Sequence, residues 1–373
     1  MPGISNITNV WNNLKEIDLR PLRQEALDVV KLALVGSPGA GREALAGQMR
    51  RDPSRPNMEL QTPLMTLDLD NAQQAGEADL ILVVVKANEG NIERHKTLTR
   101  AWSDAGKPVL VFVNQPPGQG GGPGLWVDWG QRRVVYGSVE NTFFLQGEFA
   151  GAVMELLPNQ LLSLGRHFPL FRVPIARHLI NETSFSNATY ALSTGLAEIV
   201  PIFDIPLNVA DMVVLTKAQA FLVYKLGLEL GLSTRWQDYV AEFGGVLGGG
   251  FVWRQVARSL IGFIPAWGII PKVAVSYAGT YVVGNVVLQW YLTGRHVTSE
   301  QMRELYRQAF EVGKNLAANL VNKVPRPRPM LAFKRRKPEA LPDPELKRVC
   351  PHCGRANATD AQFCQYCGQA IKT

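Results

Sequence analysis

One stretch decides the fold of the first half of this chain: Val35-Gly36-Ser37-Pro38-Gly39-Ala40-Gly41-Arg42-Glu43. An apolar run, residues 29–35, leads into the glycines, and a run that suits a helix, residues 43–50, follows them. A strand, a glycine-rich turn and a helix in this order are typical of a phosphate-binding loop. The consensus of such a loop is Gly, four residues, Gly, Lys and Ser or Thr, and the two outer glycines here have that spacing.

The glycines of this loop suit the binding of an anion. Because glycine adopts positive φ and permits close approach of the backbone, successive N–H groups can point at a phosphate. The candidate nucleotide-binding residues of the loop are Gly36, Ser37, Pro38, Gly39, Ala40, Gly41 and Arg42.

The loop departs from the consensus at its end. Arg42 stands where a Lys would reach the β and γ phosphates, and Glu43 stands where a hydroxyl would hold Mg²⁺. Arg presents its charge as a planar fork, and a carboxylate at a helix N-terminus can take the place of a phosphate. We therefore assign no catalytic residue. Two interpretations stay open, a weakened nucleotide site and a strand–turn–helix without a ligand.

Residues 29–158 alternate between strands and helices, which indicates a parallel sheet with helices on both faces. The expected strands are residues 29–35, 65–70, 78–85, 109–114 and 133–137, and a helix is expected at residues 92–105. The predicted fold class is an α/β P-loop domain with a parallel-rich sheet, then an all-α hydrophobic domain and a small zinc ribbon.

Four short motifs follow the loop in a recognisable order. They are Asp68-Leu69-Asp70-Asn71, Ala78-Asp79-Leu80-Ile81-Leu82, Asn114-Gln115-Pro116-Pro117 and Ser138-Val139. In order and spacing they resemble the Asp-x-x-Gly, apolar-strand, Asn-Lys-x-Asp and Ser-Ala motifs of Era-like GTPases, a branch of the translation-factor type. The resemblance covers residues 29–158. It implies GTP and Mg²⁺ as ligands and adds Asn114 and Ser138 to the nucleotide-binding residues.

Each of these motifs is eroded. No Gly follows Asp70, Pro117 replaces the acid that selects guanine, and Thr62 is the one hydroxyl of a short first switch suited to face Mg²⁺. Hydrolysis of GTP is therefore expected to be weak or absent. In the other interpretation, Asp68, Asp70 and Asn114 are polar residues that end buried strands.

Residues 159–322 become apolar and glycine-rich after a basic start. Residues 273–292 carry no charge, and twenty residues of this kind just span a bilayer. An earlier apolar run, residues 195–230, contains charged residues, which argues against several clean spans. Two proline pairs, Pro201 with Pro206 and Pro265 with Pro271, indicate broken helical hairpins.

This region resembles the helical domain of unknown function 697 of YcjF-type bacterial inner-membrane proteins, on residues 198–219 and 263–284. The resemblance predicts a location at the cytoplasmic face of the bacterial inner membrane, either peripheral or inserted as a hairpin. A compact helical bundle away from lipid is the alternative.

Composition sets the remaining limits. A chain of 373 residues suggests two or three domains, and no secretory leader pattern is visible at its start. Residues 1–28 read as two amphipathic helices broken near Pro21. The net charge of +7 is concentrated in a Pro-rich basic linker, residues 323–344. This linker is an extended spacer, a contact for anionic lipid, or a contact for nucleic acid.

The last segment, residues 345–373, contains all four cysteines of the chain. Cys350 and Cys353 form one C-x-x-C pair and Cys364 and Cys367 another, with ten residues between the pairs. Four thiolates at this spacing predict a structural zinc site in a zinc ribbon, with a redox dithiol as the competing interpretation.

Three functions are compatible with the sequence. The first is a membrane-associated nucleotide switch or regulator with weak or absent GTP hydrolysis. The second is a pseudo-GTPase scaffold that binds no nucleotide and docks a protein partner through its zinc ribbon. The third, binding of nucleic acid by the ribbon and the basic linker, is weaker because the rest of the chain is not basic.

Overall fold

The structure is a computed structural model. It describes residues 18–52, 55–116, 118, 128–130, 132–197, 207–239, 269–295, 297–323, 348–353, 356–357, 363, 367 and 369–370. The chain divides into two units, residues 1–321 and residues 322–373, and each is described by itself.

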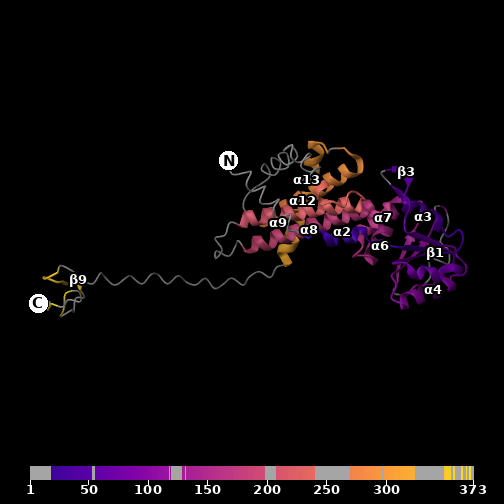
Figure 1. Cartoon of the computed structure of the whole chain (residues 1–373), viewed down its shortest axis with the longest axis horizontal. Helices are drawn as coiled ribbons and strands as arrows, with labels where there is room; N and C mark the ends of the chain where they lie inside the picture. The colour runs from indigo at the N-terminus through magenta and orange to yellow at the C-terminus, as the bar shows by residue number, and fades with distance from the viewer. Residues whose placement is uncertain are drawn as a thin grey trace. The chain divides into compact units, whose positions relative to one another are not determined.

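A five-stranded parallel sheet is the centre of the α/β part (Figure 1). Its order is β4-β1-β5-β6-β7. The interior strands β1, β5 and β6 are almost completely buried, as expected for a parallel sheet covered on both faces. The predicted α/β class with a parallel sheet is therefore confirmed. The strand bounds are β1 Leu32–Gly36, β4 Leu64–Leu67, β5 Leu80–Lys86, β6 Val109–Asn114 and β7 Arg133–Gly137.

Successive side chains of each strand enter different apolar layers. Leu34 and Leu82 pack with α3 (Arg42–Arg50) and α6 (Ala150–Leu156). Val35 and Val83 pack on the other face with the 3-10 helix η1 (Leu69–Glu77) and with α4 (Glu93–Asp104). A short helix α5 (Thr142–Phe144), capped by Asn141, and a π-helical turn η3 (Leu145–Phe149) precede α6.

Two local predictions need correction. The strand expected at residues 65–70 ends at Leu67, because the Asp68 carbonyl accepts the Asn71 N–H at 3.0 Å and starts η1. The sequence also gave no sign of the antiparallel hairpin of β2 (Arg51–Asp52) and β3 (Arg55–Glu59), which directly follows α3. Most of the glycine-rich loop after Gln115 lies outside the described residues.

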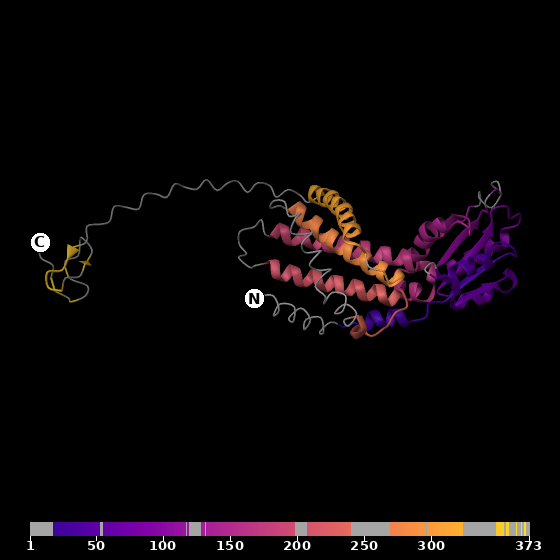
Figure 2. The same ribbon diagram turned by 90° about the horizontal axis from the view of Figure 1, so that it is seen from above.

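Long helices form the rest of the first unit. Figures 1 and 2 show α8, α9 and α12 side by side, and their packing contacts agree. One apolar core runs from the sheet into this bundle, from Leu34 through Phe149 and Phe171 to Leu222. The boundary placed at residue 158 stays a prediction. The helices are α2 Arg20–Leu27, α7 Leu161–His167, η4 Pro169–Phe171, α8 Arg172–Ala197, α9 Leu207–Glu229, α12 Ile269–Thr293 and α13 Ser299–Lys323.

Within the described residues, no helix combines the length and apolar character needed to cross a bilayer. The charge-free run that suggested insertion, residues 273–292, lies within α12. In the bundle, α12 presents Thr280 to Asn187 of α8, with Asn187 Nδ2 donating to Thr280 Oγ1 at 2.8 Å.

The prolines that were expected to break helices lie at helix starts or outside the description. Pro21 lies in the first turn of α2, where its missing N–H costs nothing. Residues 1–17 of the predicted N-terminal helix pair and Pro201, Pro206 and Pro265 of the predicted hairpins lie outside the described residues, whereas Pro271 lies in the first turn of α12.

Candidate functional site

The glycine-rich loop joins β1 to α3 at the carboxyl edge of the parallel sheet. Gly39 has a φ of 72° and Gly41 a φ of 105°, both in the left-handed region that favours glycine. Gly41 is the N-cap of α3, and as a glycine it provides no side chain to cap that helix end. The first N–H groups of α3 therefore have no partner inside the helix, which suits an anion at this point. Pro38 and Gly39 are exposed, whereas Gly36 and Ala40 are buried.

Arg42 is held inside the protein. Its side chain is only 9% exposed, and its Nη2 donates to Asp68 Oδ1 at 2.5 Å. Asp68 comes from the turn after β4, in the motif that resembles Asp-x-x-Gly. The arginine and the acid of two separate nucleotide motifs thus neutralise each other. The neighbouring Asp70 is also paired, with Arg94 of α4 at 2.7 Å.

Asn114 holds two loops together. It ends β6 and is 4% exposed. Its Nδ2 donates to the Ala40 carbonyl at 3.0 Å, and its Oδ1 accepts the Val139 N–H at 3.2 Å. Ser138, also buried, accepts the Glu140 N–H at 3.1 Å. The predicted residues Ala40, Asn114 and Ser138 are therefore brought together, and the polar groups of the Asn114 side chain are engaged by the protein itself.

Sequence reasoning missed a lysine beside the loop. Lys86 ends β5, and a Cβ added to Gly39 would lie 3.2 Å from the Lys86 ammonium nitrogen. Within the described part of the chain, no acid pairs with this ammonium. The signal was available, because the carboxyl ends of parallel strands meet at one edge and Lys86 directly follows the apolar run that ends at Val85.

A buried histidine faces the loop from α4. His95 is fully buried, and its Nε2 lies 3.4 Å from Ser37 Oγ. Burial lowers the pKa of His95, and the nearby Glu89 opposes this shift.

The structure also places two other residues that sequence analysis singled out. Thr62, which was expected to face Mg²⁺, accepts a hydrogen bond from Arg50 Nε at 3.3 Å. Glu43 is exposed at the start of α3.

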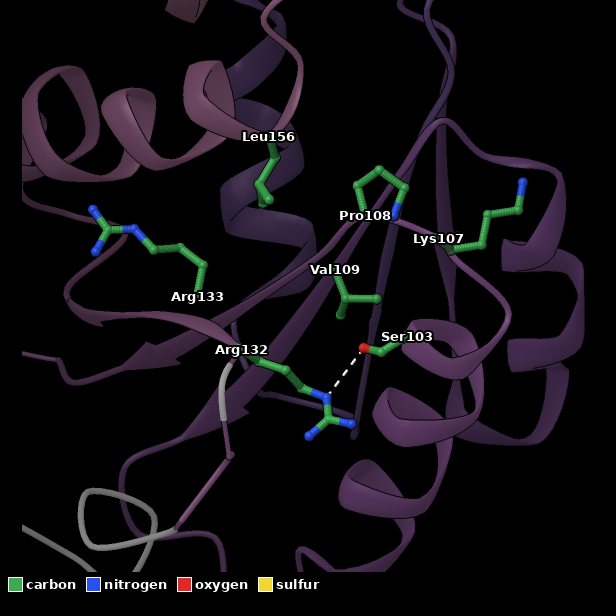
Figure 3. Close-up of a pocket in the computed structure, with 7 residues that line it drawn as sticks. All are labelled: Ser103, Lys107, Pro108, Val109, Arg132, Arg133 and Leu156. Carbon is green, nitrogen blue, oxygen red and sulfur yellow. Dashed lines mark hydrogen bonds between the residues drawn. The ribbon is translucent and has the colours of Figure 1, made fainter.

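A separate pocket lies at the opposite edge of the sheet, beside the start of β6 and β7 (Figure 3). Arg132, Arg133 and Lys107 line it, but their charged groups point in different directions (Figure 3). Arg132 Nε donates to Ser103 Oγ at 3.1 Å, and Arg133 pairs with Glu155 at 3.2 Å. These cations do not converge on one point, so we assign no ligand to the pocket.

The second unit contains the cysteine site. Cys350, Cys353 and Cys367 bring their sulfur atoms within 4.8 Å of one another, and the Cys350 and Cys367 sulfurs are 3.7 Å apart. Tetrahedral zinc with Zn–S bonds of about 2.3 Å places its sulfur ligands about 3.8 Å apart, so this donor set fits zinc. The antiparallel strands β8 (Arg348–Val349) and β9 (Ala356–Asn357) flank the first pair. Cys364 lies outside the described residues.

Comparison with known proteins agrees with the chemistry of this second unit. Residues 349–371, which include Cys364, match the zinc-ribbon domain family. This segment is therefore a zinc ribbon, and zinc is the metal that its cysteines are built to bind.

The chain is also 31% identical over 156 residues to magnetosome membrane protein 22 of Magnetospirillum gryphiswaldense. The match covers 39% of this chain and 76% of the relative. The chain therefore belongs to the family of this magnetosome membrane protein.

Proposed function

We propose that this chain is a membrane-associated regulatory or scaffolding protein whose Era-like P-loop domain binds nucleotide phosphate groups without efficient hydrolysis. The name of the magnetosome membrane relative supports association with a membrane. In this proposal the helical part acts as a YcjF-type domain at the cytoplasmic face of the inner membrane. The zinc ribbon docks a protein partner.

The Arg42–Asp68 ion pair carries the proposal. Efficient P-loop enzymes need a free cation at the β and γ phosphates and a hydroxyl and an acid for Mg²⁺. Here the cation is buried and already paired, and a carboxylate replaces the hydroxyl. Because phosphoryl transfer depends almost entirely on such positioned charges, loss of these groups removes most of the catalytic power.

The features that remain favour binding of a phosphate group. Gly39 and Gly41 shape the loop, the uncapped start of α3 offers N–H groups, and Lys86 adds a positive charge beside Gly39. We infer that Lys86 replaces the missing lysine as the group that contacts the phosphates. GTP with Mg²⁺ is the proposed ligand, on the basis of the motif order.

The alternative function is a scaffold that binds no nucleotide. It is favoured by Asn114, whose amide oxygen and nitrogen are both bonded within the protein. In that case the α/β domain is an interaction surface, and the zinc ribbon, a closed structural site, recruits the partner.

Calorimetric titration of the zinc-loaded full chain with Mg·GTP, GDP and Mg·ATP separates these two functions. The proposal predicts micromolar binding that Lys86→Met weakens at least tenfold, because it removes the cation beside the phosphates. Lys31→Met, a change at an exposed lysine just before the start of β1, is the matched control and should bind as the wild type does. If a chain shown to be folded releases no heat of binding with any of these nucleotides, the scaffold function is favoured instead.

A further inference from the structure

A buried ion pair connects the β2–β3 hairpin to the helical bundle. Arg172, the first residue of α8, donates from Nη1 to Asp52 Oδ2 of β2 at 2.7 Å. Asp52 is 7% exposed and Arg172 9% exposed. The two residues are 120 positions apart in the sequence, so the pair ties two distant parts of the chain.

The hairpin is also directly connected to the glycine-rich loop. Gly41 caps α3, α3 ends at Arg50, and β2 begins at the next residue. Both α3 and β2 pack against η4, the turn that leads into Arg172. A movement at the loop would therefore reach Asp52 through one short helix.

A second acid lies close to the same arginine. Glu229, at the end of α9, is fully buried, and neither of its carboxyl oxygens has a hydrogen-bond partner among the described residues. Burial raises the pKa of Glu229 well above its ordinary value, and Arg172 opposes that rise. Gly165 of α7 joins the two groups: its carbonyl accepts from Arg172 Nε at 3.2 Å, and a Cβ added there would lie 2.5 Å from Glu229 Oε2.

Two other charged groups beside the end of α9 have contacts of their own. Arg166 of α7 donates to the carbonyls of Leu228 and Leu232 at 3.0 Å each. Burial raises the pKa of Glu25 of α2, and the charge of Lys225 of α9 opposes that rise. The sequence of α12 contains Lys272 as its one charge. In the described part of the chain, Arg172 is the charged group that acts on Glu229.

We propose that Arg172 is a two-position latch between the α/β domain and the helical bundle. Paired with Asp52, it holds the β2–β3 hairpin against η4. Paired with Glu229, it releases the hairpin and draws the start of α8 toward the end of α9. When Glu229 is neutral, the charge of Arg172 is balanced by Asp52 alone, and the hairpin is held. The latch does not depend on the identity of any nucleotide.

Hydrogen exchange of the zinc-loaded full chain, followed by mass spectrometry, tests this proposal. Asp52→Asn should speed exchange of the β2–β3 peptide at least tenfold, because Arg172 then turns to Glu229. At a pH at which Glu229 is ionised, Glu229→Gln removes the competing carboxylate charge and should slow the same peptide at least threefold. Peptides from α4 serve as the internal reference, and Glu155→Gln, at a surface ion pair, serves as the control.

The opposite signs are decisive, because general loosening of the core would speed exchange in both variants. A change of the same sign in both, or no change in Asp52→Asn, would overturn the latch. If Glu229→Gln does not fold, the wild type provides a second test. After correction for intrinsic exchange, its hairpin should open as rising pH ionises Glu229, while α4 stays protected. A hairpin that remains equally protected across that range would overturn the proposal.

Discussion

Replacement of the buried acid Glu229 by glutamine should change how the stability of the protein depends on pH. In the unfolded chain Glu229 ionises near 4.5, whereas in the folded protein burial raises its pKa well above that value. Above pH 4.5 the folded state therefore binds one more proton than the unfolded state. The contribution of this group to stability is complete below that pH and is lost as the pH rises toward the pKa of the folded protein.

The size of this pH dependence follows from the one extra proton that Glu229 binds in the folded state. The free energy of unfolding should fall by up to about 1.4 kcal/mol for each pH unit inside this window, or roughly 3 kcal/mol over two units. Glu229→Gln cannot ionise, so this part of the slope should vanish. A fixed offset between the two proteins is expected as well, since the new amide meets Arg172, but it does not depend on pH.

Urea unfolding at half-unit steps from pH 5 to pH 8, followed by tryptophan fluorescence, measures the slope. Glu182→Gln, at an exposed acid on α8, is the matched control and should keep the slope of the wild type. Parallel curves for the wild type and Glu229→Gln would refute the reasoning, because they would show that Glu229 takes up no proton on folding.

Two further predictions concern the loop and the ribbon. Gly36→Ala should destabilise the protein by about 1–3 kcal/mol, because its Cβ would overlap the Val84 carbonyl oxygen of the neighbouring strand. Gly47→Ala, in α3 with open space around it, should instead stabilise by up to about 1 kcal/mol, and thermal unfolding of both variants checks the contrast. Cys350→Ser should abolish stoichiometric zinc, measured by elemental analysis, and leave the unfolding transition of the first unit unchanged. Retention of zinc at the wild-type level would contradict the thiolate site.

The sheet could be predicted because its interior strands β1, β5 and β6 are mostly apolar runs. The expected strand at residues 109–114 coincides with β6, and the one at residues 133–137 coincides with β7. The β2–β3 hairpin was missed because its residues, Arg51 to Glu59, are polar and lack the alternation that marks a half-buried strand. Its position depends instead on tertiary contacts, above all the pair of Asp52 with Arg172.

The site was predicted less completely than the fold. The spacing of the glycines located the loop, and the C-x-x-C pairs located the ribbon. The partner of Arg42 could not be predicted, because Asp68 is 26 residues away and the pairing depends on how β4 lies beside β1. The expectation of insertion rested on the charge-free run at residues 273–292, and a helix such as α12 can also satisfy that pattern by packing on other helices.

The most direct test of the account is turnover of Mg·GTP by the zinc-loaded full chain, with Lys86→Met assayed beside it. We expect that nucleotide binds but that phosphate release by the wild type does not exceed release by Lys86→Met. Steady turnover by the wild type that is lost in Lys86→Met would contradict it, and would show that the loop catalyses hydrolysis although Arg42 is paired with Asp68.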